Sequence, residues 1–70
     1  MANDRPLPTV EQLEAAAARL RPNEREVFEL AAGGRLSNTA IARRLGLPVP
    51  AVERLLARAL RKLDRALDRL

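Results

Sequence analysis

Cysteine, histidine, tryptophan and tyrosine are all missing from these 70 residues, and each absence excludes a class of site. Without thiols or imidazoles, the chain cannot form disulfides, thiolate or histidine metal sites, or catalysis that needs a cysteine or a histidine. Carboxylates bind Mg²⁺ or Ca²⁺ when they cluster as oxygen ligands, and the nine acidic residues are not spaced in that way. We therefore expect no enzyme, no catalytic residue, no metal site and no cofactor.

Large apolar side chains are also scarce. Phe28 is the only aromatic residue, and the positions suited to a core fall mainly to leucine, alanine, valine and isoleucine. A chain of this length has room for one small domain at most. No stretch alternates polar and apolar residues for long enough to predict a strand. The composition therefore predicts a compact all-α domain.

Long apolar runs are missing as well. Met1 is followed by Ala-Asn-Asp-Arg, without the basic and then apolar pattern of a signal peptide. No uninterrupted apolar stretch is long enough to span a bilayer. We expect a soluble cytoplasmic protein.

Positive charge is concentrated in the second half of the chain. Residues 1–34 carry four basic and six acidic side chains, whereas residues 35–70 carry nine basic and three acidic ones. The net charge of +4 therefore hides a basic half that suits a surface facing phosphate groups. The alternative is that these arginines lie on a solvated helix face.

The first half begins with a loose arm over residues 1–8, which contains two prolines. Thr9 and Gln12 have the spacing of a capping box, which predicts a first helix over about residues 10–20. A domain is expected from residue 9 to residue 70. The apolar residues at helical spacing in the first helix are Val10, Leu13, Ala16, Ala17 and Leu20.

A second helix is predicted over about residues 22–32. Pro22 suits its first position, where the missing N–H would lack a partner in any case. Glu24 and Glu26 suit the positive end of the helix dipole, and Gly33-Gly34 ends the helix. The residues expected to face the core are Val27, Phe28, Leu30 and Ala31.

The most informative stretch is LSNTAIARRLGLPVPAVERLLARALRKL, which starts at Leu36. Ser37 is a favourable N-cap for a third helix over about residues 38–45. Gly46 follows at the point where a helix ends in the left-handed conformation. A longer, basic fourth helix is expected over about residues 49–69. Two helices joined by so tight a turn indicate a helix-turn-helix, whose second helix enters the DNA major groove.

The apolar stripe of the fourth helix is longer than this motif requires. Apolar residues recur at alternating spacings of four and three, in a heptad pattern. One interpretation is that the whole stripe covers the other helices. The other is that its end meets a second copy or another protein. The candidate interface residues are Leu60, Ala66, Leu67 and Leu70.

These residues resemble a known family. PNEREVFELAAGGRLSNTAIARRLGL is similar to region four of bacterial sigma factors and to the related DNA-binding domain of LuxR-type regulators. The shared pattern is P-x-E-R-E-V, an apolar helix, a glycine-containing turn and L-S-x-x-x-I-A-x-x-L-G. ARALRKL, residues 57–63, resembles the A-K-A-L-R-K-L ending of primary sigma factors. The likeness covers about residues 20–65 and implies an all-α, four-helix domain that contains a helix-turn-helix.

The resemblance also implies function. In that family, the fourth helix binds a promoter −35 element or an operator in the major groove. The domain docks on the flap of the RNA polymerase β subunit, and LuxR-type members dimerise through the last helix. The resemblance therefore implies a bacterial protein that lies at the nucleoid, with double-stranded DNA as its main partner.

The chain departs from the family where bases are read. Primary sigma factors resemble T-R-E-R-I-R-Q there, whereas this chain has Pro48, Val49 and Pro50 in place of the first three residues. Glu53 replaces an arginine, although a carboxylate can accept a hydrogen bond from a cytosine amino group. Arg54 remains the obvious bidentate reader of guanine. The chain thus keeps residues that position DNA better than residues that read it.

Two hypotheses follow. In the first, the domain is a DNA-binding transcription regulator. In the second, it is a protein-interaction module that docks on RNA polymerase or on a sigma factor, with its DNA-reading surface largely lost and an apolar patch at Pro48, Val49, Pro50 and Leu55. The candidate DNA-binding residues are Ser37, Asn38, Thr39, Arg43, Arg44, Val49, Pro50, Glu53, Arg54, Arg58, Arg61 and Lys62.

Overall fold

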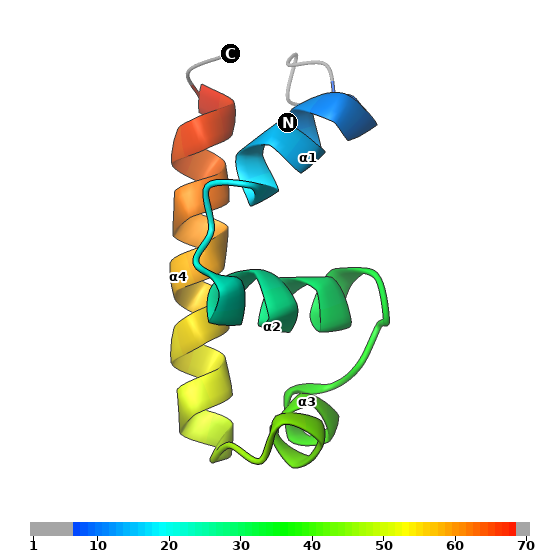
Figure 1. The fold of residues 1–70 in the computed structure, drawn as a ribbon, viewed down its shortest axis with the longest axis vertical. Coiled ribbons are helices and arrows are strands. Elements are labelled where there is room, and N and C mark those ends of the chain that lie inside the picture. The colour runs from blue at the N-terminus through cyan, green and yellow to red at the C-terminus, as the bar shows by residue number, and fades with distance from the viewer. Residues whose placement is uncertain (1–6, 69–70) are drawn as a thin grey trace, which may run out of the picture.

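The structure is a computed structural model that describes residues 7–68, and it contains four α-helices (Figure 1). No strand occurs within residues 7–68, which confirms the predicted all-α class. Each helix begins at the residue that the sequence predicts. The helices are α1 (Val10–Ala17), α2 (Pro22–Ala32), α3 (Asn38–Leu45) and α4 (Val49–Asp68).

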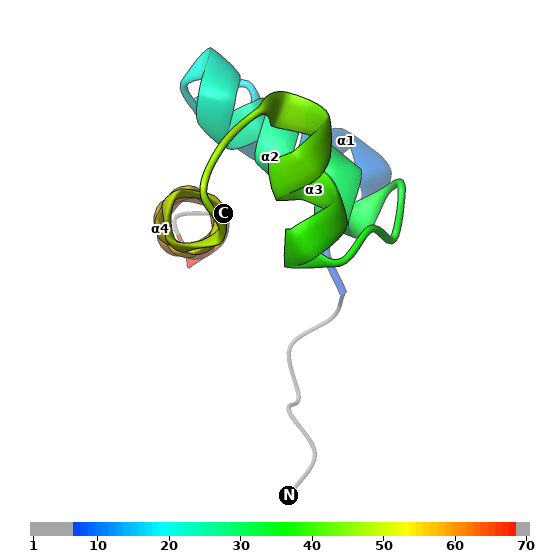
Figure 2. The same ribbon diagram turned by 90° about the horizontal axis from the view of Figure 1, so that it is seen from below.

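Helix α4 contacts each of the other three helices. The three shorter helices follow one another along it, with α1 near its C-terminal end and α3 near its N-terminal end (Figure 1). Seen along its axis, α4 stands to one side and the other helices gather on the other (Figure 2). One face of α4 therefore supplies the shared core, and its opposite face is left to solvent.

The capping box at the start of α1 is confirmed. The Thr9 N–H donates to Gln12 Oε1 at 2.9 Å, and the Gln12 N–H donates to Thr9 Oγ1 at 3.1 Å. The α-helix ends at Ala17, three residues before the predicted end. The N–H groups of Arg19 and Leu20 bond to carbonyls only three residues back, so the chain tightens into a turn there. Leu20 still reaches the core, with 7% of its surface exposed.

The core has two parts, both built on α4. The first lies between α1 and α4, and the second lies where α2, α3 and the start of α4 meet. Small residues dominate the first part, whose buried members are Ala16, Leu20, Ala59, Leu63 and Ala66. Branched residues dominate the second, whose buried members are Val27, Ile41, Ala42 and Val52.

Two residues of the apolar face predicted for α1 lie at the surface. Val10 is 69% exposed and Leu13 is 40% exposed, so the apolar face of α1 is only partly buried. The buried residues of the α1 segment are Ala16 and Leu20, near and beyond its C-terminal end. Helical periodicity identifies the face that is apolar, whereas the length of contact with α4 decides which residues that face buries.

A charged pair joins α2 to α4 between the two parts of the core. The Glu24 carboxylate is 1% exposed, and its Oε1 accepts from Lys62 Nζ at 2.7 Å and from the Arg21 N–H at 2.9 Å. Among the described residues, Glu24 Oε2 has no hydrogen-bond partner. From the sequence, Glu24 was expected only to suit the helix dipole. It is instead a buried anchor whose charge depends on Lys62, 38 residues away.

Both ends of the turn between α3 and α4 follow the sequence prediction. Gly46 adopts φ 69° and ψ 33°, and its N–H donates to the carbonyl of Ala42. This conformation is strained for a residue with a Cβ, and glycine adopts it without that cost. Leu47 and Leu56 are half-buried against the second part of the core, which fixes the direction in which α4 leaves the turn.

We expect Gly46→Ala to lower the free energy of unfolding by about 1 kcal/mol. A Cβ at this position would meet nothing within 4 Å, so the loss comes from the left-handed backbone alone. Gly46→Asn should lose less, because asparagine tolerates this conformation better. Thermal unfolding followed by circular dichroism measures the difference, and equal melting temperatures for wild type and Gly46→Ala would contradict this account.

We expect the stability of the fold to depend on pH through the Glu24 carboxylate. The hydrogen bond from Lys62, and then that from the Arg21 backbone, lower the pKa of Glu24 below its ordinary value of 4.5, although burial opposes them. A lowered pKa in the folded state means that this contribution to stability is complete above pH 4.5. It is lost as the pH falls below 4.5 and through the pKa of the folded state.

Urea unfolding at several pH values tests this contribution. Glu24→Gln should be less stable than wild type at pH 7, and its stability should fall less steeply as the pH drops below 4.5. Glu26→Gln is the matched control, because Glu26 is an exposed glutamate on the same helix. Parallel pH profiles for wild type and Glu24→Gln would show that the pair does not favour the charged carboxylate.

Candidate nucleic-acid interface

The start of α3 is held by its own cap. Ser37 Oγ accepts from the Ala40 N–H at 3.1 Å, which confirms the predicted N-cap. Ser37 and Thr39 are exposed and Asn38 is half-buried. The Ser37 hydroxyl therefore already has a backbone partner, and the exposed face at this end of α3 consists of small polar groups beside a positive helix end.

The other end of α3 carries two cations. Arg43 and Arg44 lie in its last turn, and both are exposed. Cations at the C-terminal end of a helix interact favourably with its dipole, which suits this placement. Neither guanidinium forms an ion pair within residues 7–68, so both can contact a ligand from solvent.

A row of arginines follows the outer face of α4. Arg54, Arg58 and Arg61 are exposed and separated by four and three residues, which places them on one side of the helix. Val52 and Ala59, on the other side, are fully buried. The row therefore points away from the core, and within the described part of the chain none of its members forms an ion pair.

The N-terminal end of α4 offers a mixed surface. Pro50 and Glu53 are exposed, whereas Val49 is half-buried and packs against the second part of the core. Leu55 is half-buried against the same cluster. The apolar patch expected around Pro48 is thus smaller than the sequence suggests, because much of the surface of Val49 and Leu55 is buried inside the domain.

Lys62 has a protein partner. Its ammonium donates to the buried Glu24 carboxylate, and its side chain remains 36% exposed. The sequence placed Lys62 among the phosphate contacts, and the structure shows that it also ties α4 to α2. Nothing local in the sequence indicates this pair, because the two residues belong to different helices.

Two further cations lie near Lys62 and were not among the predicted site residues. Arg19, Lys62 and Arg65 line an open pocket of about 170 Å³ together with Ala66. Arg65 continues the row of α4 arginines at the next spacing of four, a signal that the sequence does contain. Arg19 belongs to the turn after α1, and no pattern in the sequence connects it with α4.

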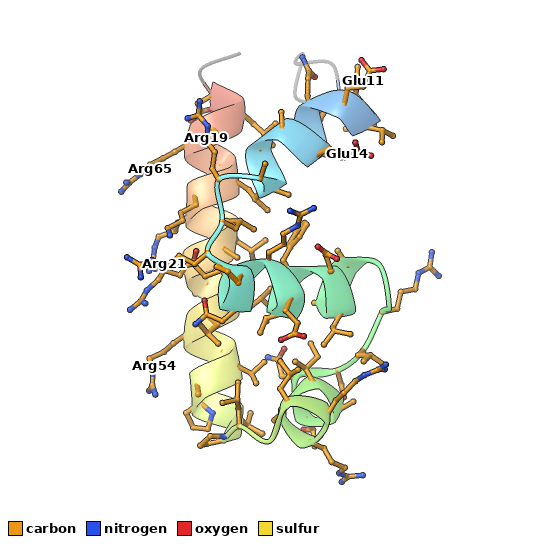
Figure 3. All side chains as sticks on the ribbon, in the orientation of Figure 1. Glu11, Glu14, Arg19, Arg21, Arg54 and Arg65 are labelled. Atoms are coloured by element: carbon orange, nitrogen blue, oxygen red, sulfur yellow. The ribbon has the colours of Figure 1, made fainter. Side chains whose placement is uncertain are left out.

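Basic side chains of α4 and acidic side chains of α1 lie in different places, although α4 also carries Glu53, Asp64 and Asp68. Arg54 and Arg65 lie along the outer side of α4, and Glu11 and Glu14 lie on α1 (Figure 3).

Within residues 7–68, no group of three acidic residues could hold a metal ion. No helix in this part of the chain is long and apolar enough to cross a membrane.

The predicted interface residues have different environments. Leu60 is 50% exposed, whereas Ala66 is buried at 9% exposure and Leu67 is half-buried, both against α1 in the first part of the core. Leu70 lies outside the described residues. The end of α4 therefore already has a partner within the chain, and Leu60 is the large apolar side chain of α4 left most exposed in the described segment.

Comparison with known proteins identifies the family. The family model described as Sigma-70, region 4 matches residues 10–63, which span all of α1, α2 and α3 and most of α4. No curated protein and no solved structure gave a significant match. Region 4 domains are non-enzymatic helix-turn-helix modules of transcription, in agreement with the fold and with the exposed arginines of α4. The chain therefore belongs to the sigma-70 region 4 family.

Proposed function

We propose that this domain is a transcription regulator that binds double-stranded DNA, with α4 in the major groove. The observation that carries the proposal is the exposed row of Arg54, Arg58 and Arg61 on the second helix of the motif, opposite its buried face. An α-helix with its side chains is about 10–12 Å wide, which matches the width of the major groove at about 12 Å. Binding would place the domain at the nucleoid of a bacterial cell.

In this arrangement, the start of α4 contacts base edges. Arg54 is the group suited to bidentate hydrogen bonds with guanine, and Glu53 is suited to accept from a cytosine amino group. Pro50 and the exposed part of Val49 offer apolar contact to thymine methyl groups. Two polar readers and two apolar side chains favour a modest preference among sequences.

Phosphate contacts then supply most of the affinity. Each phosphate that is neutralised releases counterions and adds affinity that falls with salt. The acidic residues of α1, such as Glu11 and Glu14, would favour approach with the arginine row toward DNA (Figure 3). The residues proposed for phosphate contact are Ser37, Asn38, Thr39, Arg43, Arg44, Arg58 and Arg61, with Lys62 contributing its remaining donors.

Fluorescence-anisotropy titration with duplex DNA at several salt concentrations tests the proposal. Arg58→Ala should weaken binding to all sequences alike and reduce the salt slope by about 1. Arg54→Ala should cost about 1–3 kcal/mol at a selected site and relax its sequence preference.

Arg25→Ala is the matched control, because Arg25 is an exposed arginine on α2 that pairs with Glu29 at 2.8 Å. This variant should bind DNA like wild type. If wild type binds no duplex even at low salt, or if Arg54→Ala and Arg58→Ala bind DNA no differently from Arg25→Ala, DNA binding through α4 is ruled out.

The exposure of Leu60 supports a second candidate function, contact with another protein. Leu60 is the most exposed large apolar side chain of α4 in the described segment, so it is the one that a partner protein would cover most. The candidate partners are RNA polymerase subunits, a sigma factor or a second copy of the chain through the last helix. In this role, the domain would modulate transcription without reading a site.

We expect Leu60→Lys to fold, because the side chain lies half in solvent. If the last helix forms a homodimer, sedimentation velocity should show dimers for wild type and monomers for Leu60→Lys. Equal sedimentation of the two proteins would exclude a homodimer through Leu60. It would leave the polymerase subunits and a sigma factor, tested by direct binding of each purified protein.

A further inference from the structure

We propose that Arg19, Lys62 and Arg65 form a phosphate-binding site beside the C-terminal half of α4, outside the helix-turn-helix. This inference deepens the proposed function and rests on it for the source of the phosphate, which is the backbone of the bound DNA. The site would extend the contact surface beyond the residues that the motif itself provides.

Geometry brings the three cations together from separate segments. Arg19 comes from the turn after α1, and Lys62 and Arg65 lie on neighbouring turns of α4. The three side chains line one open pocket of about 170 Å³, next to the small side chain of Ala66. Water occupies about 30 Å³ per molecule in the liquid, so the pocket has room for a group of several heavy atoms. In Figure 3, Arg19 and Arg65 both lie beside this end of α4.

The charge of the pocket is suited to an anion. Glu24 pairs with Lys62, and at 1% exposure its carboxylate lies behind the lysine, away from solvent. An ammonium has three donors, and Lys62 gives one of them to Glu24. Within the described residues, neither Arg19 nor Arg65 has an ion-pair partner. Two free guanidinium groups and the remaining donors of one ammonium therefore face the same space.

Continuity with the arginine row favours the DNA backbone as the source of the phosphate. Arg54, Arg58, Arg61 and Arg65 follow one another at spacings of four, three and four along one side of α4. At 1.5 Å per residue, Arg65 lies about 16 Å along the axis from Arg54. A DNA strand that passes the N-terminal end of α4 can therefore contact cations along the whole exposed face. Its phosphates can reach the pocket beside the C-terminal half of the helix.

The experiment compares Arg19→Gln, Arg65→Gln and the double variant with wild type. The control is Arg25→Gln, which removes one exposed positive charge elsewhere on the surface. Anisotropy titrations with a duplex of about 20 base pairs, at several salt concentrations, give the salt slope for each protein. Since one neutralised phosphate contributes about 0.9 to the slope, we expect the double variant to lose about 0.9 and the control to lose nothing.

Titration of the free protein with inorganic phosphate, followed by NMR, tests the pocket independently of DNA. Shifts at Arg19, Arg65 and Ala66 that are absent in the double variant would support the site. If these shifts occur while the DNA salt slope is unchanged, the site binds free phosphate and the DNA backbone is excluded as its source. If neither the shifts nor the change in slope is seen, the proposal is overturned.

These outcomes separate this inference from the proposed function. A wild-type protein that binds no duplex refutes DNA binding, and the phosphate titration still decides whether the pocket exists. A wild-type protein that binds DNA with a slope unchanged by the double variant keeps DNA binding and removes Arg19 and Arg65 from it. If Arg25→Gln lost as much salt slope as the double variant, the loss would come from the change in overall charge, and the proposed site would be overturned. Arg19 and Arg65 are exposed, so the variants should fold, which circular dichroism checks.

Discussion

Burial of one face of α4 is the constraint on which the rest of this structure depends. Helices α1 and α3 have eight residues each, a length that is not stable in isolation in water. Each of them gains its stability from contact with the apolar side of α4, and α2 does the same between them. Because all contacts share one face, the opposite face of α4 is free along its length. The core and the candidate binding surface are therefore two sides of the same helix.

The two parts of the core differ in the side chains that they bury. Around Ile41 and Val52, branched side chains exclude solvent completely and hold the two helices of the motif in a fixed relation. Around Ala16 and Ala59, small side chains lie between α1 and α4, and each of them contributes little apolar area of its own. Between them, the Glu24–Lys62 pair sets where α2 meets α4. Lys62 thus belongs both to the framework and to the basic surface, and its substitution would affect stability and binding together.

Features that depend on neighbouring residues could be predicted from the sequence. The caps at Thr9 and Ser37 and the left-handed turn at Gly46 all occur as predicted, because each depends on chemistry within four residues. The helical class follows from the spacing of apolar residues, and the outward row that includes Arg54 and Arg58 follows from the same periodicity. For the candidate site, this means that Arg54, Arg58 and Arg61 could be named in advance, whereas Arg65, at the next spacing along α4, was not.

Contacts between helices could not be predicted in the same way. The exposure of Val10 depends on how much of α1 reaches α4, and the burial of Glu24 depends on Lys62, which is distant in the chain. The convergence of Arg19 and Arg65 at one pocket depends on how the turn after α1 passes α4. The sequence by itself determined where the helices begin and the helix-turn-helix, because these are local. Only the tertiary structure decided which charges are buried, paired or gathered, because packing alone brings distant side chains within hydrogen-bonding range.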